Sequence, residues 1–100
     1  MSALMHSGKR FSVESLQIVT HKNNLPISRF AFVVSTKIDK RATARNRMKR
    51  LLRESVQHVF PYISTGWDAT FFVRKNFSEQ SQIQTEAVVR ELLKTAQILS

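Results

Sequence analysis

The chain has 100 residues, enough for one domain with a modest hydrophobic core and too few for two. It contains no cysteine and no apolar run long enough to cross a membrane, which excludes disulfide bonds, cysteine-ligated metals, thiol catalysis and a membrane span. Sixteen Lys and Arg against seven Asp and Glu give a net charge of +9, which is typical of a protein that binds a polyanion.

Two strands are predicted in the first third of the chain. Residues 13–21 (VESLQIVTH) are rich in β-branched side chains, and residues 22–26 read as a turn that contains Pro26. Residues 28–36 (SRFAFVVST) alternate in a run too short for a helix. Phe30, Phe32 and Val34 therefore point to one face of this strand, and the residues between them point to the other.

The run from Ala42 to Phe60 has the periodicity of an amphipathic helix, which Pro61 ends. Its predicted core stripe consists of Ala44, Met48, Leu51, Leu52, Ser55, Val56 and Val59. Its opposite face carries Asn46, Lys49, Arg50 and Arg53, with Arg45 and Arg47 at the two edges.

A third strand, residues 67–74 (WDATFFVR), and a final helix follow. We expect Ser78 to cap this helix, which extends to about Leu99 with Ile83, Ala87, Val88, Leu92, Ala96 and Leu99 on its buried side. The order strand, strand, helix, strand, helix predicts an α+β fold, a small α/β sandwich with the helices packed on one face of the sheet. The other face would carry Ala31, Val33, Ser35, Thr70, Phe72 and Arg74, either as a solvated surface or as a binding surface.

The excess positive charge lies in one segment. Residues 37–53 hold eight basic residues and the single acid Asp39, whereas the rest of the chain holds eight basic and six acidic residues. So few acids do not form a salt-bridge lattice, and arginine suits phosphate oxygens, so the segment favours nucleic acid as the partner. A solvated helix face, an anionic membrane and an acidic protein are the alternatives.

No pattern of catalytic or metal-binding residues is present. The three histidines are far apart in the sequence with no carboxylate at ligand spacing, and two glycines do not make a phosphate-binding loop. We therefore expect no catalytic residue, no metal site and no cofactor bound by the protein alone. With no apolar signal segment at the N-terminus, we expect a cytoplasmic protein that forms a single nucleic-acid-binding domain over residues 1–100.

Residues 42–54 (ATARNRMKRLLRE) match the pattern A-x-x-R-N-R-x-K-R-L-x-R-E. The chain thereby resembles the protein subunit of bacterial ribonuclease P, and the resemblance extends from about residue 8 to 98. Residues 28–37 are similar to the family strand before the signature helix, residues 67–74 to its last strand, and residues 8–11 (GKRF) to the entry into its first strand.

The resemblance implies a mixed sheet with a left-handed β–α–β crossover, as in the second domain of a ribosomal small-subunit protein. It implies a protein that binds the catalytic RNA and the 5′ leader of precursor tRNA and promotes endonucleolytic 5′ maturation, with magnesium in the RNA active site. The implied partners are that RNA and precursor tRNA, with no membrane and no DNA. The alternatives are a general structured-RNA or ribosomal RNA-binding module and a nuclease active without RNA.

The resemblance also assigns residues. The RNA-binding role transfers to Arg45, Asn46, Arg47, Lys49, Arg50 and Arg53, and Lys37, Lys40 and Arg41 join them by charge and proximity. The leader cleft is expected to include Phe11, Ser35, Phe72 and Arg74. Only seven residues precede Gly8, where the family has a basic helix, so residues 1–10 are interpreted as a remnant of that helix.

Overall fold

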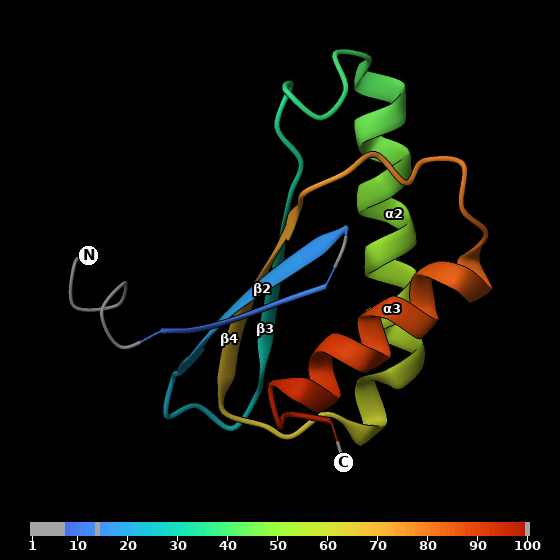
Figure 1. Cartoon of the computed structure of the whole chain (residues 1–100). Helices are drawn as coiled ribbons and strands as arrows, with labels where there is room; N and C mark the ends of the chain where they lie inside the picture. Colours follow the sequence, from blue (N-terminus) through green and yellow to red (C-terminus); the bar gives the residue numbers. More distant parts are fainter. Residues whose placement is uncertain (1–7, 14, 100) are drawn as a thin grey trace.

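A four-stranded sheet and two long helices make up the fold (Figure 1). The structure is a computed structural model that describes residues 8–13 and 15–99. In chain order its elements are β1 (Lys9–Ser12), β2 (Leu16–Lys22), β3 (Arg29–Val33), α2 (Ala42–Val59), the 3₁₀ turn η1 (Phe60–Tyr62), β4 (Trp67–Val73) and α3 (Gln82–Thr95). The predicted order is therefore confirmed from residue 16 onward, and β1 is an additional strand before it.

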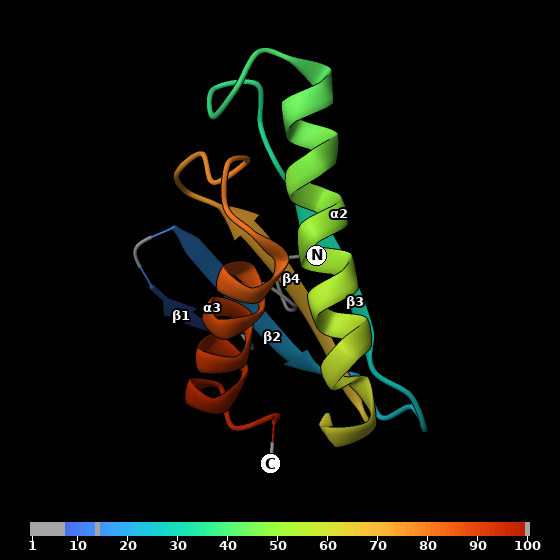
Figure 2. The same ribbon diagram turned by 90° about the vertical axis from the view of Figure 1, so that its right-hand side faces the viewer.

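The sheet is mixed, with the strand order β1-β2-β4-β3. Strands β1, β2 and β4 pair antiparallel, and β3 pairs parallel with β4. In Figure 2, seen from the helix side, β3 and β4 both run upward and β4 lies to the left of β3. The crossover through α2 is therefore left-handed, as the resemblance implied and against the strong preference for right-handed connections.

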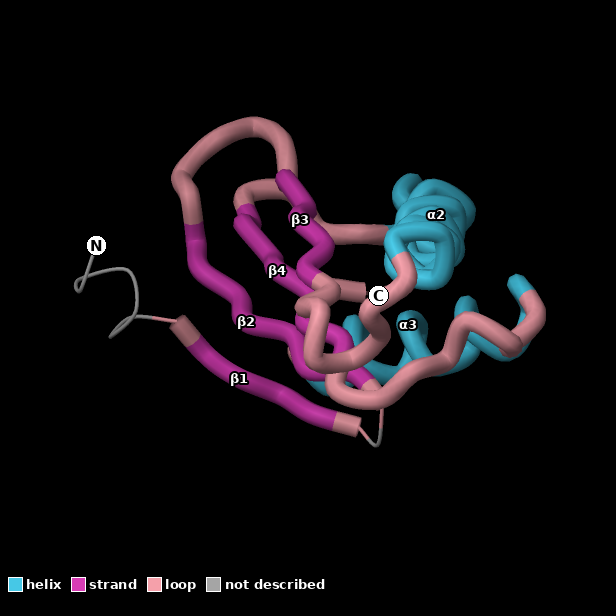
Figure 3. The backbone as a smooth tube through the Cα atoms, turned by 90° about the horizontal axis from the view of Figure 1, so that it is seen from above, coloured by secondary structure: helices cyan, strands magenta, loops and turns pink. Residues whose placement is uncertain are grey.

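Both helices lie on the same face of the sheet, which Figure 3 shows from above. The core between the two layers contains Ile18, Ala69, Phe71 and Val73 from the central strands. Phe30 and Phe32 of β3 pack against it, with Phe32 stacked on the fully buried Phe71. The opposite face of the sheet is covered by no other element among residues 8–13 and 15–99.

Helix α2 has the predicted rotation. Every member of the predicted core stripe is buried, from Ala44 to Val59, and the polar member Ser55 is satisfied by donating its hydroxyl to Leu51 O at 2.8 Å. Gln82 of α3 reaches across and donates its side-chain amide to both Leu51 O and Ser55 Oγ, which ties the two helices together.

Helix α3 differs from the prediction in its start and its buried face. Ser81, not Ser78, caps it through a capping box with Gln84. Its buried residues are Thr85, Val89, Leu92 and Leu93, and Ala96 follows them at the C-cap. The expectation of Ile83 and Ala87 in the core is wrong, because the helix packs through the stripe of Thr85, Val89, Leu92 and Leu93, which leaves Ala87 exposed and Ile83 82% exposed.

The structure of residues 8–10 also differs from the prediction. Lys9 and Arg10 lie in strand β1, so within residues 8–10 the interpretation as a helix remnant is wrong, while residues 1–7 lie outside the described residues. Gly8 comes so close to the imidazole of His21 that a Cβ at this position would lie 2.5 Å from the ring. Residue 8 must therefore be glycine for the chain to enter β1 without moving His21.

Candidate nucleic-acid interface

The outward face of α2 carries cations without counterions. Asn46, Arg50 and Arg53 are exposed and Lys49 is half-buried. None of their side chains makes a hydrogen bond or ion pair within the part of the chain that the structure describes. The only acid in the helix is Glu54. This face therefore has hydrogen-bond donors and charge available for an anionic partner.

The start of α2 adds to this positive field. Its N-cap residue Arg41 provides no side-chain cap, and the first turn contains no acid. The first backbone N–H groups of the helix and the positive end of its dipole thus point toward the basic loop before it. Lys37 and Lys40 are exposed in that loop.

Asp39 organises the loop between β3 and α2. Its carboxylate accepts hydrogen bonds from the backbone N–H of Arg41, from the Arg41 guanidinium and from Asn76 Nδ2 at 2.6 Å. These bonds, those from the Arg41 side chain above all, hold the pKa of Asp39 well below its usual range. The network joins this loop to the loop after β4, and it pairs the charge of Arg41, which distinguishes Arg41 from the other predicted RNA-binding cations.

Arg45 of α2 is hydrogen-bonded to the same loop. Its Nη1 donates to Asp39 O at 3.0 Å and to Lys40 O at 2.8 Å, and the side chain is half-buried. Because both acceptors are neutral carbonyls, the positive charge of Arg45 stays uncompensated. Arg45 therefore combines a structural contact with an uncompensated positive charge.

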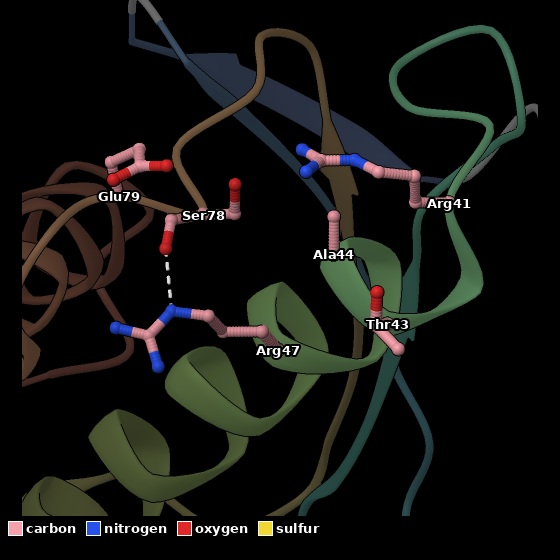
Figure 4. Close-up of a pocket in the computed structure, with 6 residues that line it drawn as sticks. All are labelled: Arg41, Thr43, Ala44, Arg47, Ser78 and Glu79. Atoms are coloured by element: carbon pink, nitrogen blue, oxygen red, sulfur yellow. Dashed lines mark hydrogen bonds between the residues drawn. The ribbon is translucent and has the colours of Figure 1, made fainter.

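Arg47 has the same double character on the other edge of α2. Its Nε donates to Ser78 O at 2.5 Å, shown by the dashed line in Figure 4. This bond helps to form a pocket of about 320 Å³ that is lined by Arg41, Thr43, Ala44, Arg47, Ser78 and Glu79. The bond connects α2 to the segment before α3, and the guanidinium again keeps its charge.

The open face of the sheet contains a second hollow, of about 300 Å³. It is lined by Arg10, Gln17, Val19, His21, Thr70 and Phe72. The strand register accounts for this set, since Arg10 lies beside Val19 and Val19 beside Thr70, while Gln17 lies beside Phe72. An aromatic ring and polar groups therefore line one concave surface.

The four residues predicted for the leader cleft separate in the structure. Phe72 lies in the hollow, and Ser35 and Arg74 are exposed just beyond the ends of β3 and β4. Phe11 pairs with the buried Ile18 and packs against the core, so the expectation that it shares the open face is wrong. The alternation of β1 places Arg10 there instead.

Several residues of these surfaces were missed from the sequence. The placement of Arg10, Gln17 and His21 on the open face follows from the register between β1, β2 and β4. The prediction had only one strand in this region, over residues 13–21, and therefore no register for β1. Asp39 had a visible signal, because it is the one acid among the eight basic residues of 37–53. Its partner Asn76 is 37 residues away, and no sequence signal pointed to that residue.

Among residues 8–13 and 15–99, no three His, Asp or Glu side chains come close enough to share a metal ion. Over the same ranges no helix has the length and apolar character needed to span a bilayer.

Comparison with known proteins identifies the family. Residues 2–97 match the family model described as Ribonuclease P. The ribonuclease P protein components of two strains of Dehalococcoides mccartyi are 43% identical over 81% of this chain and 65% of the relative, and 36% identical over 99% of this chain and 80% of the relative.

Solved structures agree on the fold. The ribonuclease P protein from Thermotoga maritima superimposes with a TM-score of 0.83 at 28% identity, covering 94% of this chain and 88% of that one. The Staphylococcus aureus protein gives a TM-score of 0.85 at 21% identity, covering 99% of this chain and 90% of that one, which shows the shared fold. The fold and the matched sequence together show that this chain belongs to the ribonuclease P protein family.

Proposed function

We propose that this chain is the RNA-binding subunit of a ribonuclease P, which removes the 5′ leader from precursor tRNA. The observation that carries the proposal is the outward face of α2, where Asn46, Lys49, Arg50 and Arg53 have no partner among the described residues. Like charges three and four residues apart destabilise a helix, and phosphates of a folded RNA relieve that repulsion. The membership of the chain in the family supports the same partner.

The charged residues of α2 and of the loop before it have three different tasks in this proposal. The exposed cations of α2, together with Lys37 and Lys40, contact RNA phosphates directly. Arg45 and Arg47 hold the flanking loops in place and add charge. Asp39 and Arg41 keep the loop in the shape that presents those lysines.

The hollow on the open face of the sheet is the proposed site for the single-stranded leader. Phe72 offers a ring on which an unpaired base stacks, and Arg10 and Arg74 offer charge for its phosphates. Ser35 and Arg74 lie at the end of the sheet from which the chain enters α2, so this surface is continuous with the basic region.

The cleavage chemistry is assigned to the RNA. Because the chain belongs to the ribonuclease P protein family, we place the magnesium ions of the reaction in the RNA and no catalytic step on this chain. The protein positions the RNA and the leader, and we propose the cytoplasm as its location.

The direct test is cleavage of precursor tRNA by the cognate ribonuclease P RNA at low magnesium, with and without this protein. We expect strong stimulation by the protein and no cleavage by the protein alone. Tight RNA binding without stimulation would support a general structured-RNA binder instead. Metal-dependent cleavage by the protein alone would contradict the assignment of the chemistry to the RNA.

The salt dependence of RNA binding tests the electrostatic part. About six phosphate contacts give a slope of log K against log salt of about −4 to −5. Arg53→Ala should make this slope shallower by about 0.7 to 0.9, the value of one contact. Lys94→Ala, which removes an exposed charge from the last turn of α3, is the matched control and should leave the slope unchanged.

A further inference from the structure

The basic face of α2 ends in an exposed aromatic ring. Phe60 directly follows the last residue of α2 and begins the 3₁₀ turn η1, and the backbone changes at Val59, which has φ −100° and ψ 1°. Asn46 and Arg53 are seven residues apart, close to two helical turns, so they lie in one row along α2, and Phe60 follows just beyond the end of the helix. At the rise of an α-helix, the end of α2 at Val59 lies about 9 Å beyond Arg53 along the axis.

The ring of Phe60 is anchored on one side and accessible on the other. Phe60 is 48% exposed, and its ring packs edge-on against Phe30, with 6.3 Å between the ring centroids and 70° between the planes. Phe30 in turn stacks on the fully buried Phe71. This chain of rings connects Phe60 to the core and limits its motion, so the exposed part of the ring is held in place.

The charged residues near Phe60 favour an anionic partner. Lys49 and Arg53 lie one turn apart on the same side of α2, toward the end that Phe60 follows, and neither cation is neutralised within the described residues. Glu54, the one acid of the helix, lies about 100° around the axis from Arg53, on the flank nearer to Arg47. A ligand for this row needs negative charge beside a flat apolar surface, and an unpaired nucleotide supplies both, as phosphate and base.

We propose that Phe60 is a stacking platform for one unpaired base of the partner RNA, in the strand whose phosphates lie along Lys49 and Arg53. The inference rests on the proposed function, because it takes the RNA bound by α2 as its ligand. It adds a contact with the base to a surface that otherwise contacts the backbone. The RNA segment at the C-terminal end of α2 is then a loop, bulge or junction, because the bases inside a duplex are already stacked.

The test compares side chains that keep or lose the aromatic face. Phe60→Leu retains apolar packing against Phe30 and removes the ring, whereas Phe60→Tyr retains the ring. We expect Phe60→Leu to weaken the affinity for the catalytic RNA about 5- to 150-fold with the slope of log K against log salt unchanged, because no charge is lost. Phe60→Tyr should bind like the unaltered protein. Ile83→Ala, on α3, is the control for removing an exposed apolar side chain.

The outcomes separate this inference from the proposed function. If Arg53→Ala weakens RNA binding and Phe60→Leu does not, the stacking role of Phe60 is refuted, whereas RNA binding by the basic face of α2 is supported. If neither change affects binding, the proposed function of α2 fails. An affinity of Phe60→Tyr as low as that of Phe60→Leu also overturns the stacking role.

A second experiment does not depend on how the leucine variant folds. A photoreactive benzoylphenylalanine at position 60, in the complex of the full chain with its RNA, should crosslink to an unpaired nucleotide. Crosslinks only to duplex RNA, or only to another protein chain, would overturn the inference.

Discussion

Leu52 and Arg53 are neighbours in the sequence with opposite surroundings, which makes their comparison a sharp test of how α2 is oriented. Leu52 is fully buried in the hydrophobic core, and Arg53 is exposed. Leu52→Ala removes apolar atoms from a packed core and leaves a cavity. Arg53→Ala removes a cation from a surface where it has no partner among the described residues.

The expected magnitudes differ by several kcal/mol. Leu→Ala substitutions at fully buried sites lower the free energy of unfolding by about 2–5 kcal/mol. A domain of this size has about 5–15 kcal/mol in total, so the change removes a large share and lowers the Tm by roughly 10–30 °C. Arg53→Ala should change the free energy of unfolding by less than about 0.5 kcal/mol, as for an isolated surface residue.

Urea unfolding followed by the fluorescence of Trp67, the only tryptophan, measures both values, and RNA titration on the same preparations measures binding. We expect Leu52→Ala to lose stability and, where it is still folded, to bind RNA with an unchanged salt slope. Arg53→Ala should show the reverse. Equal losses of stability in the two variants would refute the orientation of α2 on which the interface depends.

Three further predictions follow from other contacts. Ser81→Ala breaks the capping box of α3 and should lower the free energy of unfolding by about 1 kcal/mol in urea titrations, and an unchanged value would contradict the cap. The hydrogen bond from Arg29 lowers the pKa of Asp68 to about 2 from 3.8, so the stability this carboxylate adds is present above pH 3.8 and is lost as the pH falls through about 2. The urea midpoint should therefore fall over this range, and Arg29→Ala should make the fall smaller, whereas an identical profile in the variant would assign the fall to other groups. Phe72→Ala should weaken binding of precursor tRNA to the complete ribonucleoprotein and leave binding of mature tRNA unchanged, and equal weakening of both would remove Phe72 from the leader site.

Helix α2 was predictable because its sequence carries one unambiguous period. Seven core positions recur over 18 residues, so the buried and basic faces followed from the sequence alone, and both were placed correctly. Helix α3 was less predictable, because its buried face includes the polar residue Thr85. The apolar stripe of the sequence put Ile83 in the core, whereas in the structure the polar Thr85 is buried and donates its hydroxyl to Ser81 O.

The parts of the site that escaped prediction depend on contacts across long stretches of chain. Strand β1 is only four residues long and mostly polar, and it is stable because β2 supplies its hydrogen bonds. The bond from Arg47 to Ser78 O spans 31 residues, and periodicity carries no information on such a pair. The sequence therefore indicated which side chains could bind RNA, while tertiary contacts decided which of them are also structural.

The division of α2 into a core face and an RNA face links folding to assembly by mass action. A ligand that binds only the folded chain stabilises it by RT ln(1 + [L]/Kd), about 2.7 kcal/mol at a free RNA concentration 100 times Kd. Bound RNA would thus offset much of the loss from a substitution such as Leu52→Ala. The stability of the isolated protein is then a lower bound on its stability in the particle, and core variants that unfold alone can persist in a cell with excess RNA. Depletion of the RNA should shorten their lifetime before it affects the unaltered chain.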